Sequence, residues 1–357
     1  MKETRNRIGS IDALRSFALL GILLVHTAQL YCFYNSYNNL FYFSETGTTI
    51  QNIIFQYGRG RFVILFSILF GTSFYLILRN PNYSQKKFLW RCLILICFGL
   101  FNKLFYTPDI LLWYGINGIV LSFFPVRKMP SSAILGMSIF FYVLYFFINI
   151  NMDNYILSDE QYSMRYQFSK GVQGIFSYPY LDVLKETVLV FKSSRTMTLS
   201  YFFLGFYLGR IGIFDRLHLF NLKTISFLVG FAGLTLFIYK YFNYSPEVRN
   251  LYYLATAILY ASVFLYAYRY INGKMSLMRD YGRLGLTNYS LQNILFPMII
   301  PLIIYPAKLS FEYIVLISLA FFAIQLYFSR WWLKTHKYGP FEHLWRMFTE
   351  RRIIPNY

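Results

Sequence analysis

The fold is decided by a stretch near the N-terminus that reads IDALRSFALLGILLVH from Ile11 to His26. The apolar run continues to about residue 32 with few polar interruptions. A helix of ~20 residues, rising 1.5 Å per residue, reaches across the ~30 Å hydrocarbon core of a bilayer. A basic stretch precedes the run, as in a signal peptide, but the run is too long for one and similar runs follow it. We therefore predict an uncleaved first membrane span.

The composition of the whole chain extends this prediction. Of 357 residues, 57% are hydrophobic and only 14% are charged. A soluble domain of this composition would lack a polar surface, and disordered or collagen-like chains have a different composition. We predict an all-α, polytopic transmembrane helical bundle with about ten spans. The approximate spans are 11–32, 61–79, 88–106, 109–126, 131–151, 196–213, 223–243, 250–269, 285–306 and 311–333.

Basic residues are divided unequally between the two sides of this bundle. Of the 34 Lys and Arg residues, 23 fall on the side that carries both chain ends and 11 on the other. Because cytoplasmic segments of membrane proteins are enriched in Lys and Arg, both termini are predicted to be cytoplasmic, with an even number of spans. The excess of basic residues behind the net charge of +19 then chiefly reflects the orientation of the protein in the membrane. The expected partner is membrane lipid, and no nucleic acid is needed to explain the charge.

Two long segments, 33–60 and 152–195, are expected to fold over the outer mouth of the bundle. Both are rich in aromatic residues, which either sit at the membrane interface or recognise an acceptor. We divide the chain into an N-terminal transmembrane bundle over 1–151, the extracytoplasmic loop over 152–195 and a C-terminal transmembrane domain over 196–357.

The C-terminal tail contains a short predicted helix. It begins at Gly339 and Pro340, residues typical of a helix start. Trp345 and Arg346 are expected at the lipid headgroups, where they would anchor an interfacial helix.

The cysteines and histidines do not indicate a metal site or a disulfide framework. The three cysteines include two within one apolar run, where small buried hydrophobic side chains are expected. The four histidines show no metal-ligand spacing. We predict no bound metal.

Polar side chains inside spans are costly and therefore mark candidate sites. His26 lies ~22 Å along the first span and Asn102 ~21 Å along the third, at 1.5 Å per residue. Lys103 follows Asn102, and Asp109 begins the next span after a short turn. A base, an amide, an ammonium and a carboxylate at one depth near the outer face suit acid–base chemistry on a hydroxyl or an amine. The alternative is a structural polar cluster that holds helices together.

Three arginines within or beside spans are further candidates. Asp12 and Arg15 are three residues apart on one helix face, where an ion pair is expected. Arg15 either anchors the helix at the cytoplasmic surface or faces a cavity and contacts an anionic group such as a phosphate. Arg59 and Arg61 precede the second span on the outer side, against the charge rule. They either reach outer headgroups or bind an anionic acceptor.

The ninth predicted span opens with GRLGLTNYSLQ over 282–292. Asn288 and Gln292 are four residues apart and therefore share a helix face. This amide stripe either holds a ligand that arrives from the cytoplasm or makes hydrogen bonds between helices.

Several of these segments resemble the YeiB-type bacterial membrane proteins, which end in a domain of unknown function. The resemblance spans nearly the whole chain and implies a multi-pass protein of the bacterial cytoplasmic (inner) membrane. It rests on DALRSFALLGILLV over 12–25, LFG over 69–71, Arg91, DIL over 109–111, GRLGLTNYSLQ over 282–292 and YGPFEHLWR over 338–346.

The YeiB-type proteins in turn resemble the transmembrane acyltransferases. Those enzymes move acyl groups from cytoplasmic acyl-CoA to extracytoplasmic acceptors with an Asn/His pair. This sequence has His26 where YeiB-type proteins usually have Asn, and Asn102 where they usually have His. Two side chains that share one site tolerate such an exchange.

The resemblance and the polar residues together favour a membrane-bound acyltransferase with acyl-CoA, such as acetyl-CoA, as co-substrate. Its phosphates would meet Arg15, and His26 would take a proton from a small-molecule, glycan or lipid acceptor. Asn102 would orient the imidazole or stabilise an oxyanion. Asp109 would stabilise the protonated base, and Lys103 or Arg61 would bind an anionic acceptor.

The alternative function is a non-catalytic transporter or lipid-binding membrane protein that uses the same polar residues. Transporters often have broken helices at corresponding positions in two halves. Pro297 and Pro301 interrupt the ninth predicted span, and the first half has no equivalent. This pattern disfavours the transporter. The sequence leaves homo-oligomerisation open.

Overall fold

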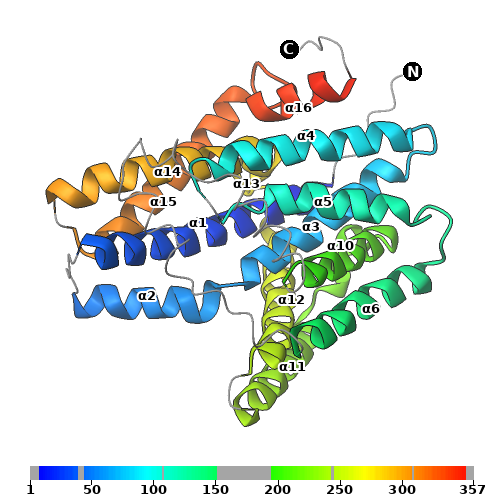
Figure 1. The fold of residues 1–357 in the computed structure, drawn as a ribbon, viewed down its shortest axis with the longest axis horizontal. Helices are drawn as coiled ribbons and strands as arrows, with labels where there is room; N and C mark the ends of the chain where they lie inside the picture. Colours follow the sequence, from blue (N-terminus) through cyan, green and yellow to red (C-terminus); the bar gives the residue numbers. More distant parts are fainter. Residues whose placement is uncertain are drawn as a thin grey trace.

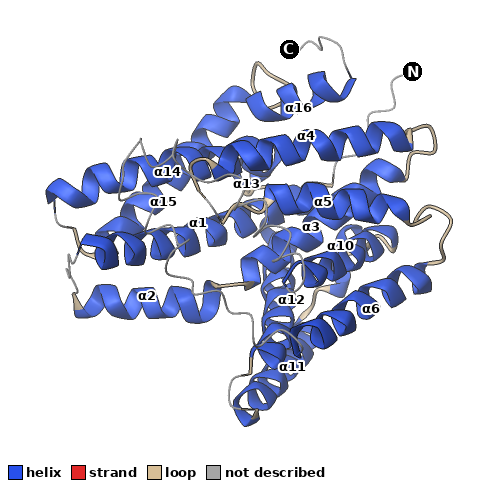
Figure 2. Cartoon of the chain, viewed as in Figure 1, coloured by secondary structure: helices blue, strands red, loops and turns tan. Residues whose placement is uncertain are grey.

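Helices make up all the regular structure that the computed structural model describes (Figures 1 and 2). The described residues are 8–38, 44–106, 108–150, 194–242, 245–307 and 309–350. The predicted all-α class is confirmed for these ranges, and the loop predicted over 152–195 lies outside them except for its last two residues. The helices are α1 (Gly9–Asn38), α2 (Glu45–Gly58), α3 (Arg61–Leu78), α4 (Gln85–Lys103), α5 (Leu111–Phe123), α6 (Ser131–Ile150), α10 (Ser194–Arg210), η1 (Ile213–Asp215), η2 (Leu217–Leu219), α11 (Leu222–Tyr241), α12 (Pro246–Ile271), α13 (Ser276–Arg283), α14 (Gly285–Ala307), α15 (Phe311–Trp332) and α16 (Pro340–Glu350).

Each of the ten predicted spans overlaps one of these helices. Length and composition alone make five stretches of the described chain capable of crossing a membrane, and two shorter apolar helices accompany them. The chain is therefore a helical membrane protein, and the number of crossings stays a prediction. The five stretches are Gly9–Cys32, Glu45–Leu78, Leu222–Tyr241, Val248–Ile271 and Phe311–Trp332.

The segment 33–60 contains a helix, α2, and its expected place over the outer mouth of the bundle stays a prediction. The hydroxyl of Ser44 accepts the backbone N–H of Gly47 at 2.8 Å, which caps the start of α2. Between α2 and α3 the chain turns at Gly60, whose φ of 81° lies in the left-handed region that favours glycine. The two helices therefore follow one another with only a short break.

Helix α1 runs through the middle of the bundle and packs against α2, α3, α12, α13, α14 and α15 (Figure 1). Its apolar side chains, such as Leu14, Leu19 and Leu23, are buried. The helix carries Arg15 near its start and His26 eleven residues later, about 16 Å further along its axis. The two candidate groups described below lie at these two levels.

Glycines let α3 and α10 touch through their backbones. A Cβ atom at Gly205 would lie 1.9 Å from the carbonyl oxygen of Ile68, and one at Gly71 would lie 2.2 Å from that of Phe202. The hydroxyl of Thr72 donates a hydrogen bond to the Gly205 carbonyl at 2.9 Å. Small residues are a common means of close helix packing in membranes, where apolar burial alone does not drive association.

The start of α1 and the tail helix α16 lie at the same end of the bundle. A Cβ atom at Gly282 in α13 would lie 1.8 Å from the carbonyl oxygen of Asp12, so α13 packs directly on the start of α1. The chain continues into α14, which contacts α16. If the chain crosses the membrane an even number of times, the start of α1 and the tail helix α16 must lie at the same end of the bundle, as they do here. The membrane face that this end occupies stays a prediction.

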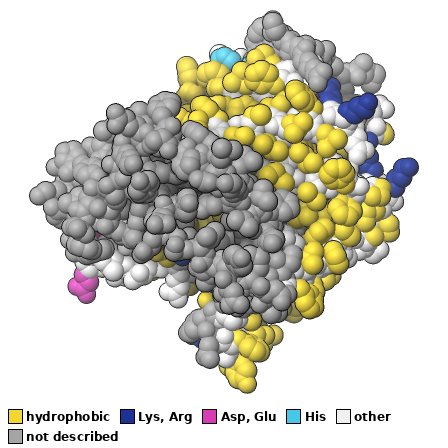
Figure 3. Space-filling view, in the orientation of Figure 1, with side chains coloured by type: hydrophobic (Ala, Val, Ile, Leu, Met, Phe, Trp, Pro, Cys, Tyr) yellow, Lys and Arg dark blue, Asp and Glu magenta, His cyan; other side chains and the backbone are white. Residues whose placement is uncertain are grey.

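Large apolar side chains cover much of the described surface (Figure 3). Phe227 and Phe237 on α11 and Ile324 on α15 are among the exposed ones. Lys and Arg side chains appear at the upper right edge of this view. Contiguous apolar surface of this kind is covered by lipid in a membrane protein.

Candidate functional site

Asp109 is the centre of a buried hydrogen-bonded group. One carboxylate oxygen accepts the backbone N–H groups of Leu111 and Leu112, at 2.9 and 3.3 Å. These are donors that a helix start leaves without partners inside the helix. The other oxygen accepts the side-chain amides of Asn102 and Asn293, at 3.2 and 3.1 Å. Asp109 therefore connects α4, α5 and α14.

Asn293 links this carboxylate to His26. Its side chain on α14 donates to Asp109 and lies close enough to the imidazole of His26 to act on it. On another side, the imidazole contacts Tyr106, with 4.4 Å between the ring centres. An imidazole packed between an amide and an aromatic ring has a restricted orientation.

Asn102 joins the group from α4. Its Nδ2 also donates to the hydroxyl of Ser290 at 3.2 Å, and its Oδ1 has no hydrogen-bond partner among the described residues. The next residue, Lys103, is close enough to act electrostatically on Asp109. The sequence-based expectation that these side chains share one depth therefore agrees with their position. We call this group the polar cluster; it consists of His26, Asn102, Asp109, Ser290 and Asn293.

The polar cluster is buried. His26 is 8% exposed, and the other four residues are at most 2% exposed. His26 is therefore the least buried member of the cluster.

A second group of charged residues surrounds a cavity of about 180 Å³ near the start of α1. Five of its lining residues are basic and one is acidic, and we call it the basic cavity. Its volume is well above that needed for one water molecule, so it can hold a ligand of several atoms. The lining residues are Arg15, Phe66, Phe70, Ser73, Phe74, Ile77, Arg91, Gly282, Arg283, Gly285, Leu286, Lys337, Tyr338, Glu342, Trp345 and Arg346.

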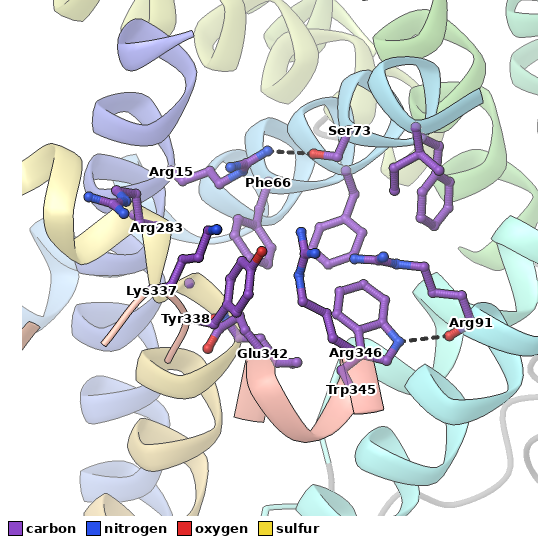
Figure 4. Close-up of a pocket in the computed structure, with 16 residues that line it drawn as sticks. Arg15, Phe66, Ser73, Arg91, Arg283, Lys337, Tyr338, Glu342, Trp345 and Arg346 are labelled. Carbon is purple, nitrogen blue, oxygen red and sulfur yellow. Dashed lines mark hydrogen bonds between the residues drawn. The ribbon is translucent and has the colours of Figure 1, made fainter. Parts of the chain in front are cut away.

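Four of the five basic side chains direct their charged ends toward the same space (Figure 4). They are Arg15 from α1, Arg91 from α4, and Lys337 and Arg346 from the tail. The guanidinium of Arg283 lies at the edge of the cavity and points away. Such convergence of like charges raises the local affinity for anions.

Arg15 faces this cavity and is not simply a surface anchor. Its guanidinium donates to Asp12 at 2.6 Å, as the spacing of the two residues predicts. A second nitrogen donates to the hydroxyl of Ser73 on α3, also at 2.6 Å. These contacts hold the guanidinium at the wall of the cavity (Figure 4).

The tail helix α16 forms one wall of the basic cavity. Trp345 packs against Arg91, whose guanidinium carbon lies 3.9 Å from the indole centre, and its ring N–H donates to the Arg91 carbonyl at 2.9 Å. Arg346 lies 4.0 Å above the ring of Tyr338. Both side chains are half-buried and line the cavity, and the expectation that they serve as headgroup anchors stays a prediction.

Glu342 attaches α16 to the start of α14. Its carboxylate accepts the backbone N–H groups of Leu286 and Thr287, at 2.7 and 3.1 Å, and the hydroxyl of Thr287. A carboxylate at a helix N-terminus is favoured by the unpaired donors and by the helix dipole. Burial raises the pKa of the Glu342 carboxyl above its usual range, and the hydrogen bonds from Thr287 oppose that rise.

This raised pKa predicts a pH-dependent stability. The folded protein keeps the proton on Glu342 at pH values where the unfolded chain has lost it. Its stabilising contribution is therefore complete below the usual glutamate pKa of about 4.3 and is lost as the pH rises through the folded-state pKa. Because Glu342 is only half-buried, we expect an effect below about 1 kcal/mol.

The measurement is the thermal midpoint of wild type and Glu342→Gln in detergent between about pH 4 and 8. The stability of the variant relative to wild type should increase with pH, because glutamine cannot ionise. Glu45→Gln, at an exposed position on α2, is the matched control and should follow wild type. A Glu342→Gln difference that stays constant across this range would contradict the prediction.

A single layer of aromatic side chains separates the basic cavity from the polar cluster. Phe66 lines the cavity and stacks on Tyr289, with 6.0 Å between ring centres. The hydroxyl of Tyr289 accepts the backbone N–H of Ile110 at 3.1 Å, directly beside Asp109. The two groups of charged residues are therefore close neighbours within the bundle.

Comparison with known proteins shows what the chain is similar to. Residues 208–352 match the model of a family described as "Protein of unknown function (DUF418)". The uncharacterized protein YxaH of Bacillus subtilis (strain 168) is 28% identical over 97% of this chain and 95% of its own length. The uncharacterized protein YeiB of Escherichia coli (strain K12) is 26% identical over 97% of each chain. The chain is therefore similar to YeiB-like proteins along nearly its whole length.

Another YeiB-like relative shows the same similarity along nearly the full length of the chain. The uncharacterized 39.9 kDa protein in the amylase 3' region of Bacillus acidopullulyticus is 27% identical over 98% of this chain and 95% of its own length. No solved structure matches the chain significantly. The comparisons confirm the resemblance predicted from the sequence motifs and assign no activity.

In this YeiB-like protein, the motifs that carry the resemblance meet around the two groups of charged residues. The motif at 282–292 supplies Gly282, Gly285 and Leu286 to the cavity wall, and the motif at 338–346 supplies the facing wall. Arg15, Phe70 and Arg91 come from three further motifs, and Asp109 opens the remaining one. Segments that are far apart in sequence therefore form one connected region.

Arg59 and Arg61 do not join the polar cluster or the cavity lining. Arg59 is exposed, and Arg61 is buried against α12. The Arg61 guanidinium donates to the hydroxyl of Thr256 at 3.0 Å and lies 4.2 and 4.9 Å from the ring centres of Tyr253 and Tyr252. A role for either arginine in acceptor binding stays a prediction.

Asn288 and Gln292 make hydrogen bonds between helices, which favours the structural alternative. The Asn288 amide donates to the carbonyl of Tyr281 and the hydroxyl of Ser329, at 3.0 and 2.9 Å. The Gln292 amide donates to the Tyr281 hydroxyl at 2.7 Å and to Gln325 at 3.2 Å. The two amides thus connect α13, α14 and α15 and do not line the basic cavity.

The sequence analysis missed Asn293 and the role of the basic tail. Asn293 is an amide inside an apolar span, so the cost of burying it was a usable signal. It follows Gln292 by one residue and therefore faces about 100° away from the Asn288 stripe. Lys337 was counted only as a marker of orientation, and Arg91 was counted as such a marker and as part of the family resemblance. Within the described residues, no group of three or more His, Cys, Asp or Glu side chains is placed to hold a metal ion.

Proposed function

We propose that this YeiB-like protein is a membrane-bound acyltransferase that moves an acyl group from cytoplasmic acyl-CoA to an extracytoplasmic hydroxyl or amine. The observation that carries the proposal is the chain His26–Asn293–Asp109, which ends one aromatic layer from a basic cavity. Acyl transfer from a charged donor needs a general base and a site that binds the donor. The oriented imidazole supplies the base, and the anion-attracting cavity supplies the donor site.

In the proposed reaction His26 takes the proton from the acceptor hydroxyl or amine. The acceptor oxygen or nitrogen then bonds to the acyl carbon, the thioester C–S bond breaks, and the thiolate takes the proton from His26. Asn293 positions the imidazole, and Asp109 holds Asn293 and stabilises the transient positive charge through it. Orientation of the imidazole was the role expected for Asn102, which instead holds Asp109 from α4.

The donor would bind with its phosphates in the basic cavity and its thioester toward the aromatic layer. Phe66 and Tyr289 would have to rotate aside for the acyl group to reach His26, because their stacked rings fill the intervening space. Side-chain rotation of this kind is within the usual range of ligand-induced change.

The closed polar cluster argues against the transporter alternative. A translocation path needs polar groups that line a water-filled route. Four residues of the polar cluster are at most 2% exposed, and their hydrogen bonds are made with one another and with the backbone N–H groups of Leu111 and Leu112. This arrangement suits a fixed catalytic group better than a pathway for a solute.

The test uses purified full-length protein in proteoliposomes with radiolabelled acetyl-CoA on the side that carries α16. Label is measured as released acetate and on glucosamine or glucose, which serve as amine and hydroxyl probes on the other side. We expect turnover well above that of protein-free vesicles. Absence of turnover, together with no shift of the thermal midpoint by millimolar acetyl-CoA, would overturn the proposal and favour a non-catalytic protein.

A further inference from the structure

The basic cavity has the properties of a built anion site. It concentrates five basic side chains and one carboxylate in the lining of about 180 Å³, and four of the basic ends converge (Figure 4). Apolar side chains, including Phe66, Phe70 and Phe74, form part of the same lining. Charges beside apolar walls interact more strongly than charges in open water. Repulsion among the cations is therefore relieved best by a bound anion.

We propose that the basic cavity binds a ligand that carries two phosphate groups, and that the tail segment 337–346 supplies half of the binding groups. This inference deepens the proposed function, because it rests on that function for the identity of the ligand as an acyl donor. The binding of the phosphate groups themselves does not depend on acyl transfer.

Two carboxylates near the cavity, Asp12 and Glu342, are engaged by other groups of the protein. Asp12 is engaged by Arg15 at 2.6 Å, and that pair accounts for one of the converging cations. Glu342 is directed to the N-terminus of α14, where it accepts three hydrogen bonds from Leu286 and Thr287. Three further cationic ends then face the space, which suits a ligand with more than one negative charge.

Two of these cations are held in the geometry that phosphate binding uses. Arg91 stacks on Trp345 and Arg346 stacks on Tyr338, at 3.9 and 4.0 Å. Stacking uses the flat face of a guanidinium, whereas phosphate binds to the N–H groups at the edge of the guanidinium. One guanidinium can therefore make both contacts at the same time. Lys337 adds a flexible point charge from the same tail segment.

The phosphate groups can belong to a soluble molecule or to a lipid headgroup. In both cases the recognised chemistry is the same, since arginine pairs bind phosphate oxygens irrespective of the rest of the ligand. The cavity lies at the end of the bundle predicted to be cytoplasmic, where soluble phosphate esters and anionic lipids are both present.

The test measures binding of inorganic pyrophosphate to full-length protein in nanodiscs of zwitterionic lipid by calorimetry. We expect Arg91→Gln, Arg346→Gln and Lys337→Gln each to weaken binding about tenfold or more. Lys86→Gln, an exposed lysine on α4 that does not line the cavity, is the matched control and should bind like wild type. Because Lys337 is exposed, its replacement should leave the fold intact. Lys337→Gln therefore still tests the site if an arginine variant is unstable.

A second arm tests a lipid source by native mass spectrometry of protein purified from membranes that contain phosphatidylglycerol. The matching anionic lipid is cardiolipin, which has two phosphate groups and is included in the same membranes. Retained cardiolipin that pyrophosphate displaces, and that the three cavity variants lose, supports the site with a lipid headgroup as occupant. Pyrophosphate binding without retained lipid supports a soluble occupant. If neither probe distinguishes the three variants from Lys86→Gln, the inference is wrong.

The two proposals fail in different ways. Binding that depends on the cavity residues, without any acetyl-CoA turnover, would uphold the phosphate site and overturn the acyltransferase. If the three variants Arg91→Gln, Arg346→Gln and Lys337→Gln turn over acetyl-CoA at the wild-type rate, the acyltransferase is upheld and the phosphate site is overturned.

Discussion

Replacing His26 with alanine is expected to lower the rate of acyl transfer by about 10²- to 10⁴-fold, the range for loss of a general base. His26 is the least buried member of the polar cluster, and Asn293 lies beside its imidazole. Without the imidazole, no base takes the proton from the acceptor hydroxyl or amine. The measurement is the initial rate of label transfer from acetyl-CoA in proteoliposomes.

His218→Ala is the matched control for this variant. His218 lies on η2 at an exposed position outside both groups, so its replacement should leave the rate unchanged. The thermal midpoint of each variant shows whether the fold survives. Asn293→Ala should lower the rate less than His26→Ala and change its pH dependence, because the base remains but loses the amide beside it. A folded His26→Ala variant with wild-type transfer would contradict the assignment of the base.

Replacing Asp109 with alanine is expected to destabilise the protein by about 3–5 kcal/mol, the range for removing one partner of a buried polar or ionic group. The carboxylate accepts four hydrogen bonds at a position that is 1% exposed. Each donor left without a partner in a buried site costs ~1–3 kcal/mol, and these costs are not additive. The measurement is equilibrium unfolding in mixed micelles with increasing sodium dodecyl sulfate.

Asp215→Ala provides the comparison for a carboxylate without such partners. Asp215 lies on η1 and is exposed, so its loss should change the free energy of unfolding by less than about 0.5 kcal/mol. The free energy of unfolding of Asp109→Asn should fall between those of wild type and Asp109→Ala, since an amide oxygen can still accept the Leu111 N–H. Equal stabilities of Asp109→Ala and Asp215→Ala would show that the four hydrogen bonds contribute little.

Prediction from sequence succeeded where the signal is local. All ten predicted spans overlap helices, because a continuous apolar run specifies a membrane helix without reference to the rest of the chain. The rise per residue also placed His26 and Asn102 at one depth, and Asp109 connects with Asn102 directly and with His26 through Asn293. Helix α2 was missed because its 14 residues are too short and polar for a span.

Prediction was weaker where a side chain's direction around its helix decides its role. Arg61 precedes the second predicted span against the charge rule, and the sequence suggested an acceptor site near His26. In the structure its guanidinium turns to the two tyrosines of α12 instead. Helix rotation is set by packing against neighbours, which a single sequence does not reveal.

The apolar runs, of which Ile11 to His26 begins the first, therefore determined by themselves that this protein is a bundle of membrane helices, because lipid forces the backbone to satisfy its own hydrogen bonds. The distribution of Lys and Arg added a predicted orientation. Only the tertiary structure decided that Asn293 stands between His26 and Asp109, and that Arg91, Lys337 and Arg346 converge on one cavity with Arg15, for which a cavity was one of two expectations. These contacts join residues up to hundreds of positions apart, and they depend on how the helices pack rather than on any local pattern.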